Sequence, residues 1–313
     1  MHNDPLMAQR GTTARTLGAH RTIDAVAYAY DQPVLFYVLA TAIPWALWFL
    51  AAYLSHLEEQ TTAVLVSTLV LSVAGLLAPL AVVAGLVWHK PALQADIISR
   101  LGWPAGAPWP LLLCSLFLLP ASLFAAQAIS LLFGYDASQF QFRGGYTFTA
   151  GLLPVWVTLL GAAVLEELAW HSYGTDTLIR RMRVFTASLV FTVIWVIWHV
   201  PLAFIEGYYH SEVVESGWLQ TLNFPLSMIA FVILMNWLYF RCGRSILVPI
   251  IFHTAANFSA EIFLTHPDSK LIQTAILLVV AAVVVVRERT LFFAPPRLPV
   301  KRAAFSRRQE SHS

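Results

Sequence analysis

Three short stretches of this chain place acidic, imidazole and carboxamide side chains in apolar surroundings: EELAWH at 166–171, WVIWH at 195–199 and HTAAN at 253–257. A carboxylate can take a proton from water and pass it on, and an imidazole beside it can hold that water. A second imidazole and a carboxamide can donate hydrogen bonds to the oxyanion of a tetrahedral intermediate. The residues that supply this set are Glu166, His199, His253 and Asn257. The sequence therefore predicts hydrolysis.

The first stretch contains two adjacent glutamates with different predicted roles. Residues four apart share a face of a helix, so Glu167 faces His171. Glu166 points about 100° away from Glu167 around the helix axis. We therefore expect Glu166 to point into the site and Glu167 to pair with His171 beside it.

The other two stretches follow the same helical spacing. His253 and Asn257 are four apart and project together, and Trp195 lies one turn before His199. Pro201 removes one helical hydrogen bond just after His199, which predicts a bend that opens space beside the imidazole. We place His199 near the middle of its helix.

These residues lie in a chain whose composition is that of a membrane protein. It has 313 residues, of which 58% are hydrophobic and 12% are charged, whereas soluble domains carry about 25% charged residues. Runs of roughly 20 apolar residues can span a bilayer as helices. The sequence predicts an all-α, polytopic bundle of about eight transmembrane helices, at 33–54, 62–88, 108–134, 148–171, 185–205, 219–240, 245–263 and 271–287.

The 19 Lys and Arg residues indicate how this bundle is oriented. Only Arg143 and Lys270 fall in the loops that follow odd-numbered helices. Cytoplasmic loops carry the excess of Lys and Arg, so both termini are predicted to be cytoplasmic. The Glu166–Glu167 pair then lies toward the cytoplasmic end of its helix. Compact loops and a basic tail favour a multi-pass protein of the bacterial inner (plasma) membrane.

The chain divides into a cytoplasmic lead-in at 1–32, the bundle at 33–287 and a basic cytoplasmic tail at 288–313. Ionisable groups inside a bilayer are costly and should face the bundle interior. Asp176, in a predicted loop, and Glu261, near a helix end, are expected to be solvated. Asn223 and Asn236 either line a cavity or tie helices together. The tryptophans expected at the membrane interfaces are Trp45, Trp48, Trp88 and Trp218.

The three stretches, in this order and each on its own predicted membrane helix, resemble the motifs of the CAAX-protease and bacteriocin-processing family (CPBP, Abi, Rce1-like) of intramembrane proteases. The family patterns are EExxxR, FxxxH and HxxxN. The resemblance covers about 145–262 and implies an intramembrane endopeptidase of the CAAX prenyl protease type. It implies that Glu166 and His199 activate water near the cytoplasmic side of the bilayer, that His253 and Asn257 form the oxyanion hole, and that Glu167 is a supporting acid.

The chain departs from the family patterns at two positions. His171 replaces the Arg, so the partner of Glu167 is neither bidentate nor permanently charged. Trp195 replaces the Phe, which conserves the shape. Both residues are expected to support the site.

The expected cofactor is none, although a divalent metal such as zinc is an alternative. In a metal-dependent variant of the protease, Glu166, His199 and His253 would be the metal ligands. We favour the metal-free mechanism because Asn is a poor zinc ligand and the His and Glu residues already have another use.

The expected partners are the lipid bilayer and a peptide or protein substrate that is lipidated or membrane-associated; no nucleic acid is expected. The alternative to an enzyme is a non-catalytic membrane scaffold or bacteriocin immunity protein, in which the same polar residues only stabilise the bundle.

Overall fold

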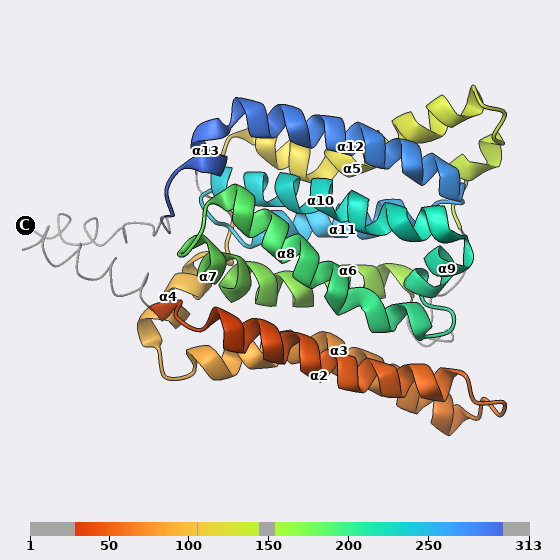
Figure 1. The fold of residues 1–313 in the computed structure, drawn as a ribbon, viewed down its shortest axis with the longest axis horizontal. Helices are drawn as coiled ribbons and strands as arrows, with labels where there is room; N and C mark the ends of the chain where they lie inside the picture. The colour runs from red at the N-terminus through yellow and green to blue at the C-terminus, as the bar shows by residue number, and fades with distance from the viewer. Residues whose placement is uncertain (1–28, 105, 144–153, 297–313) are drawn as a thin grey trace, which may run out of the picture.

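The protein is a bundle of long helices, seen in a computed structural model that describes residues 29–104, 106–143 and 154–296 (Figure 1). Its elements are α2 (Pro33–Ser55), α3 (Thr62–Val87), α4 (Pro91–Ser99), α5 (Trp109–Leu131), η1 (Ala137–Phe140), α6 (Val155–Ala169), η2 (Trp170–Gly174), α7 (Thr175–Ile179), α8 (Val184–His199), η3 (Val200–Phe204), α9 (Tyr209–Glu215), α10 (Trp218–Arg241), α11 (Leu247–Glu261), α12 (Pro267–Arg287) and α13 (Arg289–Phe293). The described part of the chain has no β-strand, so the all-α prediction is confirmed.

Six helical segments in the described ranges are long and apolar enough to cross a bilayer: α2, α3, α5, α8 with η3, α10 and α12. The protein is therefore a polytopic membrane protein, as predicted. The helix α11 has 15 residues, which is shorter than the roughly 20 residues that a span needs, whereas α6 continues without a break through η2 into α7. The count of eight spans and the cytoplasmic termini stay predictions.

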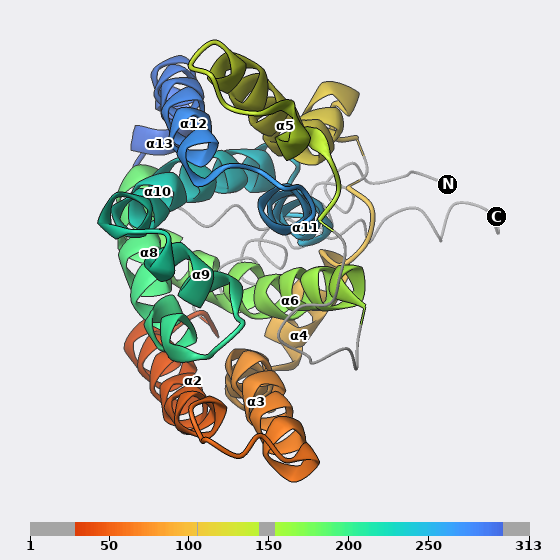
Figure 2. The same cartoon turned by 90° about the vertical axis from the view of Figure 1, so that its right-hand side faces the viewer.

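The helices that carry the three stretches lie at the centre of the bundle. In Figure 1, α2 and α3 lie along one side, α5 and α12 along the other, and α6, α8, α10 and α11 between them. The helices α4 and α13 mark one end, here called the basic end, and α9 marks the opposite end, here called the α9 end. Figure 2 looks onto the α9 end.

The helix at 148–171 was predicted with the wrong C-terminal end. Within the described residues, α6 continues through a π-helical turn, η2, into α7 and ends at Ile179. Glu166 therefore lies near the middle of this continuous helix and not toward its end. Asp176 was predicted to be solvated in a loop, which is wrong: it lies in α7 and is 0% exposed. The polar residues after His171 have the composition of a loop, but in the structure they are buried in the bundle and their polar groups find partners there.

Two arginines and two aspartates form ion pairs with one another beside this segment. We call them the Arg–Asp cluster: Asp96, Arg100, Asp176 and Arg244. Arg100 lies 3.1 Å from Asp96 and 3.0 Å from Asp176 (N···O). Arg244 contacts the same two carboxylates, and all four side chains are at most 6% exposed. Burial alone would raise the pKa of Asp96, but the guanidinium groups of Arg244 and Arg100 outweigh burial and lower it.

The Arg–Asp cluster also explains how the π-helical turn is stabilised. A π turn interrupts the regular hydrogen-bond ladder and is often found at functional sites. Arg100 donates to the carbonyl oxygens of His171 (3.1 Å) and Ser172 (2.8 Å), and the Tyr239 hydroxyl lies 2.9 Å from the first of them. The turn that carries His171 is thus held from the basic end.

The structure ends α8 at His199, so this residue is not in the middle of its helix as predicted. The chain continues from Val200 to Phe204 as a 3₁₀ helix with Pro201 in its first turn. Proline has no N–H to donate, which favours this change of helix type. His199 is consequently placed at a helix end, beside open space.

Trp48 was predicted to lie at the membrane interface, which is wrong. It is 1% exposed, and its indole N–H donates to the carbonyl oxygen of Ser72 (3.0 Å). In contrast, Trp88 and Trp218 are 70% and 73% exposed, as interface residues should be. Sequence cannot separate these cases because all three flank or occupy apolar runs.

Candidate active site

A single cavity of about 600 Å³ joins the three stretches. Its lining includes Glu166 from α6, His199 from α8, and His253 and Asn257 from α11. The structure thus brings the four predicted residues to one space that is large enough for water and a ligand. Their catalytic roles stay predictions.

Trp195 connects Glu166 to His199. Its indole N–H donates to Glu166 Oε2 (3.0 Å), and its main-chain carbonyl lies 2.6 Å from His199 Nδ1. A carbonyl can only accept a hydrogen bond, so Nδ1 carries the proton and Nε2 is left as an acceptor. His199 can therefore accept a hydrogen bond from a water molecule through Nε2.

Glu167 is fully buried and does not compete for that water. Its carboxylate accepts hydrogen bonds from His171 Nδ1 and from His253 Nδ1, the latter at 2.7 Å. The predicted Glu167–His171 pair is present, and the link to His253 is an additional one that helical spacing could not show. Glu167 thus ties α11 to the π-helical turn and fixes the His253 ring.

The second nitrogen of His171 shows how this residue can replace an arginine. The Ser188 hydroxyl donates to a main-chain carbonyl, so it accepts from Asn236 Nδ2 (2.9 Å). Asn236 Oδ1 then faces His171 Nε2 (3.0 Å), which must carry a proton. Both ring nitrogens of His171 face oxygen atoms, so the ring links Glu167 to Asn236 of α10.

The sequence left open whether Asn223 and Asn236 of α10 line a cavity or tie helices together, and the structure gives the two residues different positions. Asn236 is buried and ties α6–α7 to α8, whereas Asn223 lines the cavity. In α11, Asn257 Nδ2 donates to the carbonyl oxygen of Leu159 (3.1 Å). A carboxamide nitrogen has two hydrogens, so Asn257 keeps one for a ligand in the cavity.

The alternative metal ligands named from sequence, Glu166, His199 and His253, all line the cavity. No group of three His, Cys, Asp or Glu side chains in the described ranges has metal-binding geometry. His199 and His253 each use Nδ1 in a hydrogen bond within the protein. A metal ion could therefore reach these two rings only through Nε2, and the metal-free mechanism stays a prediction.

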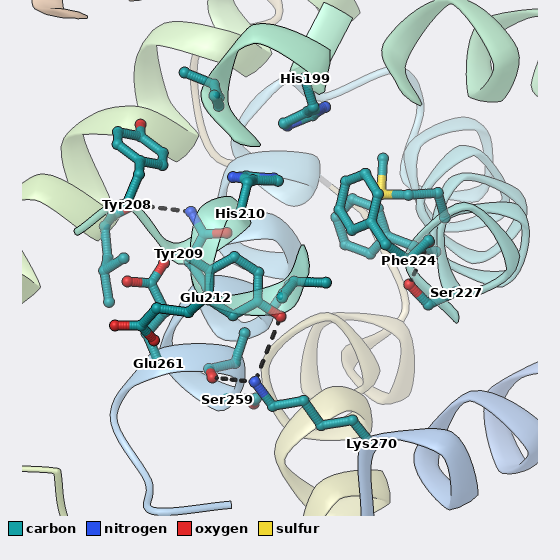
Figure 3. Close-up of a pocket in the computed structure, with 18 of the residues that line it drawn as sticks. His199, Tyr208, Tyr209, His210, Glu212, Phe224, Ser227, Ser259, Glu261 and Lys270 are labelled. Carbon is teal, nitrogen blue, oxygen red and sulfur yellow. Dashed lines mark hydrogen bonds between the residues drawn. The ribbon is translucent and has the colours of Figure 1, made fainter. Parts of the chain in front are cut away.

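Sequence reasoning missed the residues at the mouth of the cavity. Tyr208, Tyr209 and His210 precede or begin the short helix α9 and line the cavity together with Glu261 (Figure 3). Glu261 was predicted to be solvated, but it is only partly exposed. The sequence feature that could have indicated these residues is the run YYH in the loop that follows the helix of His199.

The cavity reaches the α9 end of the bundle and not the basic end. Its lining includes Gly207, Glu212 and Lys270, and it includes no described residue from 88–108, 180–183 or 241–246. The sequence assigned the cytoplasm to the latter loops. Cytoplasmic termini and hydrolysis near the cytoplasmic side were both predicted, and both stay predictions.

Comparison with known proteins gives two matches. The sequence model of the family described as Type II CAAX prenyl endopeptidase Rce1-like matches residues 147–259, a range that includes all the candidate site residues. A protein named CAAX prenyl protease 2 from Methanococcus maripaludis is 32% identical over 268 residues, which cover 85% of this chain and 97% of that protein.

Proposed function

The chain belongs to the Rce1-like CAAX prenyl endopeptidase family, and from this premise we propose that it hydrolyses a peptide bond in the cavity lined by Glu166, His199, His253 and Asn257. Membership of this family supports an intramembrane endopeptidase. The observation that carries the proposed residue roles is that the four side chains, from three helices, line one cavity.

In the proposed reaction, a water molecule lies between Glu166 and His199 Nε2. The Glu166 carboxylate takes a proton from this water, and the resulting hydroxide attacks the carbonyl carbon of the peptide bond. When the C–N bond breaks, protonated Glu166 gives its proton to the leaving nitrogen. Trp195 orients both partners through its two hydrogen bonds.

The oxyanion of the tetrahedral intermediate is assigned to His253 and Asn257. His253 Nδ1 is engaged with Glu167, so donation to the oxyanion must come from Nε2–H. A ring with protons on both nitrogens is a cation, and the adjacent Glu167 carboxylate stabilises that form. Asn257 donates its second N–H. The metal-free mechanism is the one we propose.

The test uses the purified protein and a farnesylated peptide that ends in a CAAX sequence, since the relative is named for that activity. Mass spectrometry of the products should find a new peptide terminus. In parallel, membrane peptides of cells with wild-type protein or the Glu166→Gln variant are compared, and an uncut precursor should accumulate in the variant. Absence of any cleaved product in both experiments would favour the alternative of a non-catalytic scaffold.

We further propose that the cavity opens on the face of the membrane opposite to the cytoplasm. Arg143 and Lys270 are the only Lys or Arg residues predicted in the odd-numbered loops, and both line the cavity. Since basic loops stay cytoplasmic, the α9 end faces outward. The proposed membrane is the bacterial plasma membrane, and the substrate is a membrane-associated peptide segment on its outer side.

Cysteine labelling should confirm this orientation. Both native cysteines are first replaced (Cys114→Ala, Cys242→Ser), and Val214→Cys or Arg183→Cys is then introduced at an exposed position of the α9 end or the basic end. In intact cells, a membrane-impermeant maleimide should label Val214→Cys, whereas Arg183→Cys should react only after permeabilisation. The reverse pattern would place the cavity on the cytoplasmic side.

Trp195→Phe tests the link between Glu166 and His199. The substitution keeps an aromatic ring but removes the donor to Glu166, so kcat should fall about tenfold while the unfolding free energy changes by about 1 kcal/mol. Trp198→Phe is the matched control, because Trp198 Nε1 has no hydrogen-bond partner among the described residues. Equal activity of the two variants would show that the Trp195 hydrogen bond does not contribute.

A further inference from the structure

A second cavity, of about 310 Å³, lies at the basic end of the bundle and shares no lining residue with the proposed active site. It lies where membrane helices begin or end: α8 begins at Val184, α10 ends at Arg241, and α12 ends at Arg287 just before α13 (Figure 1). The ends of spanning helices lie near the lipid headgroups, because a span only covers the hydrocarbon core. The cavity is therefore at the level of the headgroups.

The walls of this second cavity are mostly apolar. Its side of α13 is held in place because the Phe293 ring packs on Phe185 of α8 with centroids 5.2 Å apart, and because Phe292 is 0% exposed. A pocket of this size with apolar walls suits a hydrocarbon group. The apolar side chains that line it come from α7, α8, α10, α13 and one loop, and they include Ile179, Met182, Val184, Phe240 and Leu291.

The lining also contains one arginine whose charge is not used within the described structure. Arg183 is exposed, lines the cavity, and makes no hydrogen bond or ion pair with a described residue. The described carboxylates at the basic end already have other partners, since Asp31, Asp96, Asp176 and Glu288 are each paired with a lysine or another arginine. A guanidinium group can bind a phosphate through two parallel hydrogen bonds. Arg183 is therefore available to an anion from outside the protein.

We propose that this cavity binds an anionic phospholipid, with Arg183 on the phosphate and part of an acyl chain against the apolar walls. A phospholipid combines the two groups that the cavity matches, an anion and a hydrocarbon chain, and it is present at the depth where the cavity lies. Basic pockets between the ends of membrane helices bind anionic lipid headgroups in the same way. The inference does not depend on the proposed peptidase function.

The test compares phosphatidylglycerol with phosphatidylcholine of the same acyl chains, added to the purified full-length protein in detergent. Native mass spectrometry measures bound lipid, and thermal unfolding is recorded for each variant. Wild-type protein should bind phosphatidylglycerol in preference, and Arg183→Gln should lower its apparent affinity about tenfold, because a hydrogen-bonded charge pair is lost. The matched control is Arg287→Gln, which removes an exposed arginine at the same end that does not line the cavity. This control should leave the affinity unchanged.

A second variant tests the apolar part of the site while Arg183 stays in place. Ala294→Trp puts a large ring at an exposed position of the lining and should also weaken phosphatidylglycerol binding; if it fails to fold, Thr290→Trp replaces it. Glycerophosphoglycerol, the headgroup without acyl chains, should not compete with the lipid.

Four results would overturn the proposal. They are equal binding of the two lipids, equal loss in Arg183→Gln and Arg287→Gln, full binding in the tryptophan variant, and competition by the headgroup alone, which would indicate a site for free phosphate esters. A full-length variant with Lys301→Gln and Arg302→Gln should still bind phosphatidylglycerol. Loss of binding in that variant would assign the lipid to the basic tail and not to the cavity.

Discussion

Replacing Glu166 with glutamine is expected to lower the hydrolytic rate about a thousandfold, with little change in substrate affinity. The amide cannot take a proton from water, and positioned acid–base groups contribute about 10²–10⁴ in rate. The amide oxygen can still accept the hydrogen bond from Trp195, so the cavity should keep its shape. The measurement is kcat and KM of purified protein, with thermal unfolding as a check on folding.

Glu261→Gln is the matched control for this experiment. Glu261 is a second carboxylate in the lining of the same cavity, but the proposed reaction gives it no role, so its variant should retain activity within a few-fold. If Glu166→Gln retains wild-type turnover, the proposed base is wrong. If both variants lose activity alike, the cavity needs its total negative charge and not one particular base.

Replacing Asp176 with alanine is expected to lower the unfolding free energy by about 3–5 kcal/mol. Removal of one member of a buried ion pair leaves its partner charged and desolvated. Arg100 and Arg244 would then share Asp96 alone within the Arg–Asp cluster. Because Arg100 also caps the carbonyls of the π-helical turn, the geometry of His171 and Glu167 should loosen, and activity should fall at temperatures below the unfolding transition.

The control for Asp176→Ala is Glu212→Ala, which breaks an exposed ion pair with Arg143 (2.7 Å). Exposed pairs contribute about 0–1 kcal/mol, so reversible unfolding in mixed micelles should separate the two variants clearly. A loss below about 1 kcal/mol for Asp176→Ala would mean that the cluster is not a main source of stability at the basic end.

Local spacing was sufficient to predict which of the candidate residues share a helix face. Residues four apart must share a helix face, so the Glu167–His171 pair and the joint orientation of His253 and Asn257 follow from sequence. The cost of polar groups in a bilayer directs such residues inward, which is why Glu166 and His199 could be expected in the same interior. The long apolar runs predicted the bundle for the same reason.

Predictions failed where a buried polar group forms its hydrogen bond or ion pair with a residue that is far away in the sequence. The segment after His171 was read as a loop, because no local pattern shows that Arg100 and Arg244 would bury Asp176. The link from Glu167 to His253 joins residues 86 positions apart. His210 contacts His199 because the chain turns back toward the cavity after α8.

The sequence by itself determined the fold class and the existence of the long apolar helices, because these depend on hydrophobicity and on helical period. Only the tertiary structure decided where α6 ends, which two histidines donate hydrogen bonds to Glu167, and which end of the bundle the cavity reaches. Those features depend on contacts between helices, and a contact of that kind leaves no periodic signal in either of the segments that make it.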